Sequence, residues 1–342
     1  MLVTGATGFV ASQVVEQLLV RGYRVRATVR DPGKTRSEGH LTALPGASER
    51  LELVQADLLV PSAFDEPVAG CEYVIHTASP YVIHVEDPQR DLVDPAVEGT
   101  TSVLAACVAA ATVKRLVLTS SVAAISDLAD GHVNRENEWN TRSTLRRNPY
   151  HYSKTMSERA AWDFVEANHP RFDLVALYPS YVIGPSLVPG LNTSHTFFTG
   201  FTNGRLPEIL AIEWPFVDVR DVALAHVRAM ENPVAKGRYV IAAGSRTMRQ
   251  VVDLLRENGW GERYRLPTLS LDRGVGVTLS RFAAVFQPSG LRSYMRDQLG
   301  GRMQFDNSKA RRELDMEFMD VDRSILDTMD DLERWGHLGT RR

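Results

Sequence analysis

The chain reads Val3-Thr4-Gly5-Ala6-Thr7-Gly8-Phe9-Val10-Ala11 between a short apolar segment and a helical pattern over residues 9–21. Gly5 permits a tight turn, Gly8 allows backbone to approach a pyrophosphate, and Ala11 lets the helix pack against the strand. The start of the helix offers unpaired N–H groups and the positive end of its dipole. A glycine turn between a strand and a helix therefore predicts dinucleotide binding, with a ligand-free glycine turn as the alternative. The residues expected to contact the cofactor here are Gly5, Thr7, Gly8, Phe9 and Val10.

Short apolar segments alternate with helical patterns through the first half of the chain. The expected strands cover residues 1–4, 24–29, 51–55, 73–77, 116–120 and 174–178, and the main helices cover 9–21, 95–111 and 150–168. Strands separated by helices predict right-handed βαβ units and a doubly wound parallel sheet of the α/β class. We expect a Rossmann domain over residues 1–180 and a smaller, mostly helical substrate lobe over 181–342. Segments near 216–230 and 237–243 are expected to return to the first domain.

The composition excludes several classes of function. With 44% hydrophobic and 24% charged residues, the 342-residue chain has the composition of a globular protein. A net charge of −3 without a basic run argues against nucleic acid as a partner. No leader or membrane span is expected, so the predicted location is the cytoplasm, with no membrane contact. The two cysteines give neither a disulfide framework nor a metal site. We expect a monomer or a homodimer.

The end of the second strand distinguishes between the two nicotinamide cofactors. A carboxylate there holds the ribose of NAD, whereas a nearby arginine accommodates the 2′-phosphate of NADP. Val29 stands where the acid is expected, Arg30 follows it, and Lys34 adds a second positive charge. The sequence therefore favours NADP(H). The alternative is that Arg30 is solvated and Asp31 contacts the ribose.

Two further segments follow strands at the same sheet edge, where ligands of doubly wound sheets bind. Asp57, next to Leu58, is placed to accept a hydrogen bond from the adenine amino group, although helix capping is an alternative. The fourth strand is followed by Thr77, Ala78 and Ser79, which we also expect to contact the cofactor.

Tyr150 and Lys154 are separated by four residues in an expected helix, so they lie on the same face. A nearby ammonium lowers the pKa of a phenol, and such a tyrosine can donate a proton to a carbonyl oxygen. Such a pair also occurs by chance in many helices. Tyr152 lacks this arrangement because Met156 stands four positions after it.

Several motifs of the chain, and their order along it, resemble those of the extended short-chain dehydrogenase/reductase family. The resemblance is to its dihydroflavonol-reductase-like branch in particular. That branch includes cinnamoyl-CoA reductases and NADPH-dependent aldehyde reductases. The resemblance covers nearly the whole chain: the glycine turn, the strand ending Thr119-Ser120-Ser121, the Tyr150–Lys154 pair, and residues 27–32, 216–222, 225–226, 237–239 and 306–310.

The resemblance implies a catalytic triad of Ser121, Tyr150 and Lys154, in which Lys154 also holds the nicotinamide ribose. It further implies that Thr119 touches the cofactor and that Pro179 and Val182 belong to a segment under the nicotinamide ring. The implied reaction is hydride transfer from NADPH to a carbonyl carbon, with Tyr150 donating the proton.

The chain departs from the family at two points. Glu98 stands where many members carry an asparagine that supports a water relay to the lysine. Residues 122–126 contain no asparagine of the kind that reads the flavonoid ring, which weakens dihydroflavonol as the substrate.

The expected substrate is a neutral aldehyde or ketone with an apolar part, because no charged cluster suggests a phosphate-bearing one. Specificity is expected from residues 81–86, 126–147, 186–206 and 266–294. Residues 195–201 and 210–214 supply groups suited to an apolar pocket, although about half of them are expected to be core of the lobe. His195 is more simply a structural residue. The alternatives are a hydroxysteroid dehydrogenase, a nucleotide-sugar epimerase or dehydratase, or a non-catalytic NADP-binding regulator.

Overall fold

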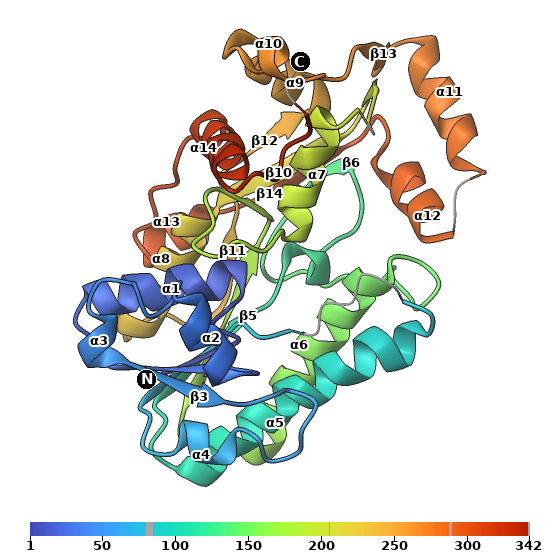
Figure 1. Ribbon diagram of the computed structural model, residues 1–342. Helices are drawn as coiled ribbons and strands as arrows, with labels where there is room; N and C mark the ends of the chain where they lie inside the picture. The colour runs from blue at the N-terminus through green and yellow to red at the C-terminus, as the bar shows by residue number, and fades with distance from the viewer. Residues whose placement is uncertain (80–84, 205, 287–288, 341–342) are drawn as a thin grey trace.

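A seven-stranded, all-parallel sheet organises the computed structural model, which describes residues 1–79, 85–204, 206–286 and 289–340 (Figure 1). The strand order is β11-β7-β5-β4-β1-β2-β3, which confirms the expected doubly wound α/β fold. The strands are β1(Leu2–Thr4), β2(Val25–Val29), β3(Leu51–Gln55), β4(Tyr73–His76), β5(Arg115–Thr119), β7(Asp173–Pro179) and β11(Gly237–Ile241).

The central strands are apolar on both faces because helices cover both. Val117 of β5 is paired with Ile75 of β4 and Val175 of β7, and all three side chains are fully buried. Continuous burial of this kind explains why these strands appear in the sequence as unbroken apolar runs rather than as alternating patterns.

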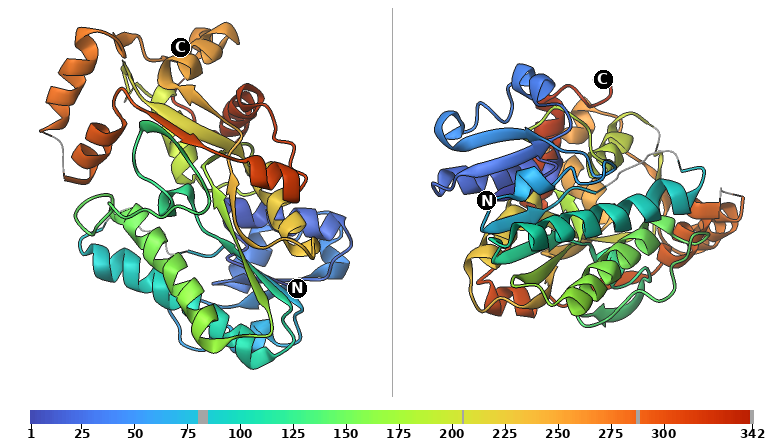
Figure 2. Two further views of the ribbon diagram at one scale, coloured as in Figure 1. Left: turned by 180° about the vertical axis from the view of Figure 1, so that it is seen from behind. Right: turned by 90° about the horizontal axis from the view of Figure 1, so that it is seen from below.

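Two helical layers enclose the sheet, as Figures 1 and 2 show. Helices α1(Phe9–Val20) and α8(Val219–Glu231) pack against each other on one face. Helices α5(Asp94–Ala110) and α6(Pro149–Asn168) pack together on the other face. The smaller elements of this domain are α2(Pro32–Glu38), α3(Ala47–Arg50), α4(Asp65–Val68), the π-helical turn η1(Gln89–Val93) and the 3-10 turn η2(Val122–Ala124).

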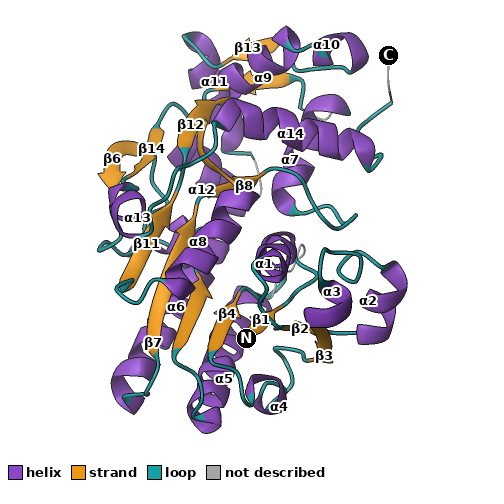
Figure 3. Ribbon diagram, turned by 90° about the vertical axis from the view of Figure 1, so that its left-hand side faces the viewer, coloured by secondary structure: helices purple, strands orange, loops and turns teal. Residues whose placement is uncertain are grey.

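A second lobe gathers on one side of the main sheet (Figure 3). It contains a three-stranded sheet of order β12-β10-β8 and the two-stranded pairs β13-β9 and β14-β6. Its strands are β6(Asp130–Asn134), β8(Tyr181–Ile183), β9(Glu208–Leu210), β10(Glu213–Asp218), β12(Gly244–Thr247), β13(Leu269–Leu271) and β14(Arg302–Phe305). Its helices are α7(Thr193–Thr202), α9(Met248–Glu257), α10(Trp260–Arg263), α11(Val275–Ala284), α12(Ser289–Gln298), α13(Ser308–Glu313) and α14(Val321–Arg334).

The two expected returning segments behave differently. β11 joins the main sheet at its edge beside β7, and α8 returns to the first domain as a helix against α1. β10 does not join the main sheet, in which β11 is the edge strand beside β7. β10 instead pairs with β8 and β12, which places Phe216 opposite Tyr181.

Residues Gln89–Ala110 form a continuous helix that is long and apolar enough to cross a membrane by length and composition alone. This differs from the expectation that no apolar stretch reaches the length of a span. Half of its apolar window is buried, and α5 packs along α6 on the sheet. A core helix of a globular domain passes the same test, so the packing accounts for its apolar character.

Candidate active site

The glycine turn after β1 leaves little room for side chains at Gly5 and Gly8. Gly5 has φ +66°, and a Cβ placed on it would lie 3.0 Å from the Cβ of Ala78. Gly8 is the N-cap of α1 without a side-chain cap, and its added Cβ would lie 3.1 Å from the carbonyl oxygen of Gly5. Thr7 is exposed, and Phe9 and Val10 begin the helix. The N-terminus of α1 is therefore bare backbone that can donate N–H groups to an anion.

At the end of β2, the structure separates the roles of Arg30 and Asp31. The Asp31 carboxylate caps α2 by accepting a hydrogen bond from the Lys34 N–H at 2.9 Å. Arg30 is exposed, and no hydrogen bond or ion pair engages its guanidinium within the described ranges. Lys34 is exposed as well and lies 3.7 Å from Glu38. Because the acid is used within the helix cap, Arg30 is the exposed charged side chain that remains at the end of β2.

The two other predicted cofactor segments lie at the same edge of the sheet. Asp57 accepts a hydrogen bond from the Leu59 N–H at 3.0 Å, so its carboxylate closes a turn after β3 rather than capping a helix. Leu58 packs against Gly99 of α5 and lines the pocket described below.

The loop after β4 is fixed by Thr4. Its hydroxyl oxygen accepts hydrogen bonds from the N–H groups of Thr77 at 3.1 Å and Ala78 at 3.0 Å. It also lies 2.8 Å from Nδ1 of buried His76, to which it can donate its own hydrogen. The Thr77 hydroxyl in turn donates to the Thr4 carbonyl at 2.5 Å. Thr77 thus stabilises the loop, and the loop brings Ala78 and Ser79 to the glycine turn.

Tyr150 and Lys154 lie in the first turns of α6. Tyr150 is 41% exposed, and its ring meets the His151 ring edge-on at 5.9 Å. Lys154 is half-buried and donates a 3.1 Å hydrogen bond from Nζ to Ser79 Oγ. Burial lowers the pKa of Lys154 to about 8, and the nearby Glu158 carboxylate opposes that shift. Tyr152 is half-buried on the same helix.

Buried charges anchor the start of α6. Asp127 accepts a 2.8 Å hydrogen bond from the side-chain amide of Asn148, the residue that precedes the helix. Arg147 lies 3.1 Å from Asp127 and 2.9 Å from Asp297 of α12. These contacts fix the first turn of α6, which carries Tyr150, against both lobes.

The end of β5 places three consecutive hydroxyls in different surroundings. Ser121 is half-buried and accepts a 3.2 Å hydrogen bond from the Ala123 N–H. Ser120 is buried and donates to Glu158 at 2.7 Å. Thr119 lies 2.7 Å from Nε2 of His226, so its hydroxyl is already held within the protein. Thr119 nevertheless lines the pocket, as does Ser120.

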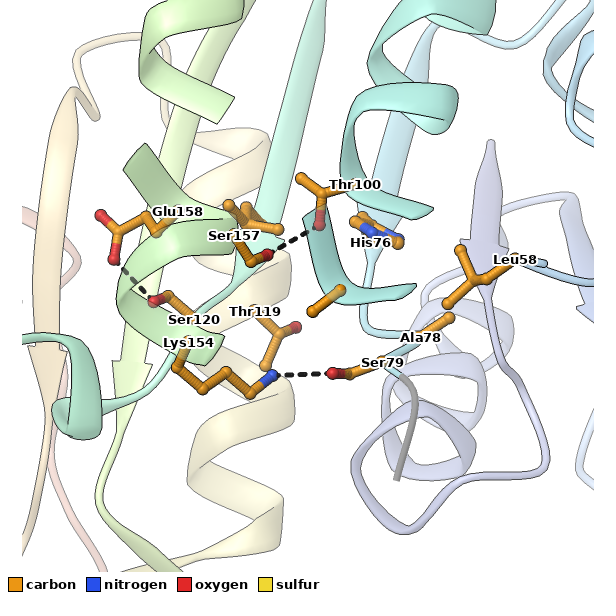
Figure 4. A pocket seen from close by; sticks show the side chains of 12 residues that line it. Leu58, His76, Ala78, Ser79, Thr100, Thr119, Ser120, Lys154, Ser157 and Glu158 are labelled. Carbon is orange, nitrogen blue, oxygen red and sulfur yellow. Dashed lines mark hydrogen bonds between the residues drawn. The ribbon is translucent and has the colours of Figure 1, made fainter. Parts of the chain in front are cut away.

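Lys154 is one of the residues that line a polar pocket, and Figure 4 shows the side chains around it. Its lining residues are Leu58, His76, Ala78, Ser79, Ala96, Thr100, Leu118, Thr119, Ser120, Lys154, Ser157 and Glu158. Five of them belong to the cofactor and catalytic segments predicted from sequence: Leu58, Ala78, Ser79, Thr119 and Lys154. The pocket therefore joins the expected cofactor edge to the expected catalytic helix.

Sequence reasoning missed Glu158 and the Thr100–Ser157 pair. Ser157 and Thr100 are hydrogen bonded at 2.9 Å across α5 and α6. Glu98, which occupies the asparagine position of the family, is exposed on α5, whereas Thr100 lines the pocket. Glu158 stands four residues after Lys154 in the sequence, and this spacing places the two side chains on one face of a helix.

Several residues of segments 195–201 and 210–214 belong to the core of the lobe, as expected for about half of them. Phe198 and Phe201 are fully buried in the lobe, and Trp214 is nearly so. His195 is buried and lies 3.0 Å from the Gly184 carbonyl oxygen through Nε2, which makes it a structural histidine. Phe197 is half-buried and lies edge-on to Trp214 at 4.5 Å.

Pro179 and Val182 lie where the chain leaves the main sheet for the lobe. Pro179 ends β7, and Val182 is a half-buried residue of β8. Residues 80–84 lie outside the described part, and with them most of the expected specificity segment 81–86. Residue 205 of segment 186–206 and residues 287–288 of segment 266–294 lie outside it as well.

The fold and the site together define a dinucleotide-dependent oxidoreductase of the extended short-chain dehydrogenase/reductase type. Its features here are the parallel sheet, the N-terminus of α1 without a side-chain cap, and the helix that carries Tyr150 and Lys154. Residues 1–242 match the NAD dependent epimerase/dehydratase family, and the chain belongs to that family.

The relatives within it are reductases. The chain is 44% identical to cinnamoyl-CoA reductase CAD2 of Medicago truncatula over 264 residues, covering 75% of this chain and 79% of the relative. It is 36% identical to cinnamoyl-CoA reductase 1 of Arabidopsis thaliana, covering 98% and 90%. Gre2 of Candida albicans, solved in complex with NADPH, superposes with a TM-score of 0.80 at 30% identity, covering 98% of each chain.

Proposed function

We propose that the protein uses NADPH to reduce the carbonyl group of a small to medium apolar aldehyde or ketone, with Tyr150 as the proton donor. The observation that carries the proposal is the placement of Lys154. It is one helical turn from Tyr150, and its ammonium contacts Ser79 at the edge of the sheet that also carries the glycine turn. The reductase activity of the relatives supports the same reaction class.

The bound nicotinamide would supply the hydride, and the chain supplies the rest. The N–H groups of the α1 turn bind the pyrophosphate, and Arg30 pairs with the 2′-phosphate. Lys154 holds the ribose, and its positive charge favours the ionised phenol of Tyr150. Ser121 and Tyr150 both donate hydrogen bonds to the substrate oxygen, on which negative charge develops during reduction. Tyr150 then transfers its proton to that oxygen.

The proposed substrate rests on the charges of the lobe. Many arginines and acids near its helices are paired with each other, as in Arg249 with Asp272 at 2.7 Å. Binding of a neutral carbonyl compound requires no further charged partner.

Replacing Tyr150 with phenylalanine tests the proposal. Reduction of a panel of aldehydes and ketones is followed by NADPH absorbance. We expect Tyr150→Phe to lower kcat by at least about a hundredfold, because general acid catalysis contributes factors of this size. NADPH affinity, measured by fluorescence, should stay within about threefold.

Tyr152→Phe is the matched control, because it removes a hydroxyl from the same helix two residues away, and it should retain turnover. Full activity in Tyr150→Phe would refute the assignment. NAD that copurifies with the protein, with no reduction of any carbonyl, would instead favour an epimerase.

A further inference from the structure

Glu158 extends the row formed by Tyr150 and Lys154. The three residues are four positions apart on α6, so they lie along one face of the helix. Glu158 is 1% exposed. Its carboxylate accepts hydrogen bonds from Ser120 at 2.7 Å, from the Trp162 indole at 2.9 Å, and also from the Tyr178 hydroxyl.

Arg238 of β11 completes the environment of Glu158. Its Nε donates to the Glu158 carboxylate at 3.0 Å. Its Nη1 donates to the carbonyl oxygens of Glu136 at 2.7 Å and Glu138 at 2.8 Å, and its guanidinium lies 3.9 Å from the centre of the Trp139 ring. A buried ion pair is weak evidence for stability, since apolar residues of similar volume often serve as well. The placement of this pair behind Lys154 suggests a different role.

Glu158 is the acidic side chain that faces Lys154 within the described part of the pocket. From α6 the pocket receives Lys154 and Glu158, with Tyr150 one turn before them; from β4 it receives His76. Burial lowers the pKa of His76 to about 3, and it lowers the pKa of His151, whose ring lies against Tyr150, to about 4. Both rings are therefore neutral near neutral pH. Arg238 lies behind Glu158 on β11, and Ser79 and Thr119 bring hydroxyls without charge.

We propose that Glu158 and Arg238 together determine how tightly the Tyr150–Lys154 pair holds its proton, with Glu158 acting as a positioning residue rather than a catalytic one. The inference rests on the proposed role of Tyr150 and Lys154. Glu158 also ties Ser120 to α6, which fixes the strand end that carries Ser121 against the helix that carries Lys154.

The sign of the effect follows from charge alone. Two interacting groups lose their first proton as a unit, and a nearby anion raises the pH at which this happens, whereas a nearby cation lowers it. Removing the charge of Glu158 leaves the Arg238 cation uncompensated near the pair. Burial raises the pKa of Glu158, and Arg238 opposes that rise together with the hydrogen bonds from Ser120 and Trp162. Removing Arg238 leaves the Glu158 carboxylate, whose charge is then supported by the hydrogen bonds from Ser120, Trp162 and Tyr178. The two substitutions should therefore move the titration of the Tyr150–Lys154 pair in opposite directions.

The test is the pH dependence of kcat for carbonyl reduction in Glu158→Gln, Arg238→Met and the double variant. Activity falls at high pH when the pair loses its proton. We expect this basic limb to move down by about one pH unit in Glu158→Gln and to move up in Arg238→Met. In the double variant it should lie between the limbs of Glu158→Gln and the unaltered protein.

The double variant protects the test against misfolding, because it leaves no unpaired buried charge. Asp173→Asn is the matched control. Asp173 pairs with buried Arg115 at 2.7 Å at the opposite end of β5 and β7, so its loss should leave the limb in place. Thermal melting of each variant verifies the fold.

A limb that stays in place in Glu158→Gln, or moves in the same direction in both single variants, would overturn the inference. That failure is distinct from failure of the proposed function. Tyr150→Phe would still be inactive in the first case, whereas retained turnover in Tyr150→Phe would remove the basis of both.

Discussion

Lys154 Nζ donates a 3.1 Å hydrogen bond to Ser79 Oγ, and this contact joins α6 to the loop after β4. The neighbouring Ala78 packs against Gly5, where a Cβ would have only 3.0 Å of space. The loop after β4 therefore contacts both the glycine turn and α6, and it connects a change at the glycine turn to Lys154.

Arg30 should determine the preference for NADPH over NADH. A charge-assisted contact with a phosphate contributes about 1.5–3 kcal/mol, so reversal of the charge should weaken NADPH binding at least about tenfold. We expect Arg30→Glu to raise the Kd of NADPH by that factor and to change the Kd of NADH little. Fluorescence titration with both cofactors measures this.

Arg24→Glu is the control for Arg30→Glu. Arg24 is exposed and just precedes the other end of β2, so its replacement makes the same charge change far from the cofactor edge. Equal loss of affinity for both cofactors in Arg30→Glu would show that Arg30 does not read the 2′-phosphate.

Most of the fold could be predicted from the sequence, because the patterns that indicate strands, helices and turns lie within short segments of the chain. Buried residues such as Val117 and Val175 form unbroken apolar runs, and the glycine turn joins a strand to a helix. Most boundaries of the expected strands and helices differ by one residue, since backbone hydrogen bonds at element ends depend on neighbours that the pattern does not show. The pairing of β10 depended on which strand occupied the edge of β7, and a single short segment carries no information about that.

The site was predicted in part for the same reason. Tyr150 and Lys154 are four residues apart, so one local pattern identifies both. Glu158 and Arg238 are 80 residues apart, and only the packing of β11 beside β7 brings them together. A glutamate or an arginine in a helical or strand pattern normally indicates a solvated face, so their burial could not be inferred from sequence.

Gly5→Ala should damage both the fold and the cofactor site. A residue with a Cβ costs roughly 1–2 kcal/mol in the left-handed region, and the added methyl would also press on Ala78. We expect a lower melting temperature and a weaker affinity for NADPH.

Gly22→Ala is a matched control, because Gly22 has φ +84° with nothing within 4 Å of its added Cβ. It should lose stability without losing NADPH affinity. Equal NADPH affinity in the two variants would contradict the assignment of Gly5 to the binding turn.

Asp221→Asn should stabilise the protein above pH 6 and have little effect near pH 4. Asp221 is buried in the first turn of α8 and accepts a 2.8 Å hydrogen bond from the Met319 N–H. Burial raises its pKa from 3.8 to about 6. The folded state therefore disfavours the ionised form, and the cost grows as the pH rises from about 4 through 6. At full ionisation the cost is at most about 3 kcal/mol, since one pKa unit corresponds to about 1.4 kcal/mol. An asparagine can accept the same hydrogen bond without the charge.

Melting temperatures measured from pH 5 to 8 should show Asp221→Asn gaining a few degrees over the unaltered protein at pH 8, and less at pH 5. Asp330→Asn on the exposed side of α14 should give no such trend. A gain that is the same at every pH would mean that the charge of Asp221 is not its cause.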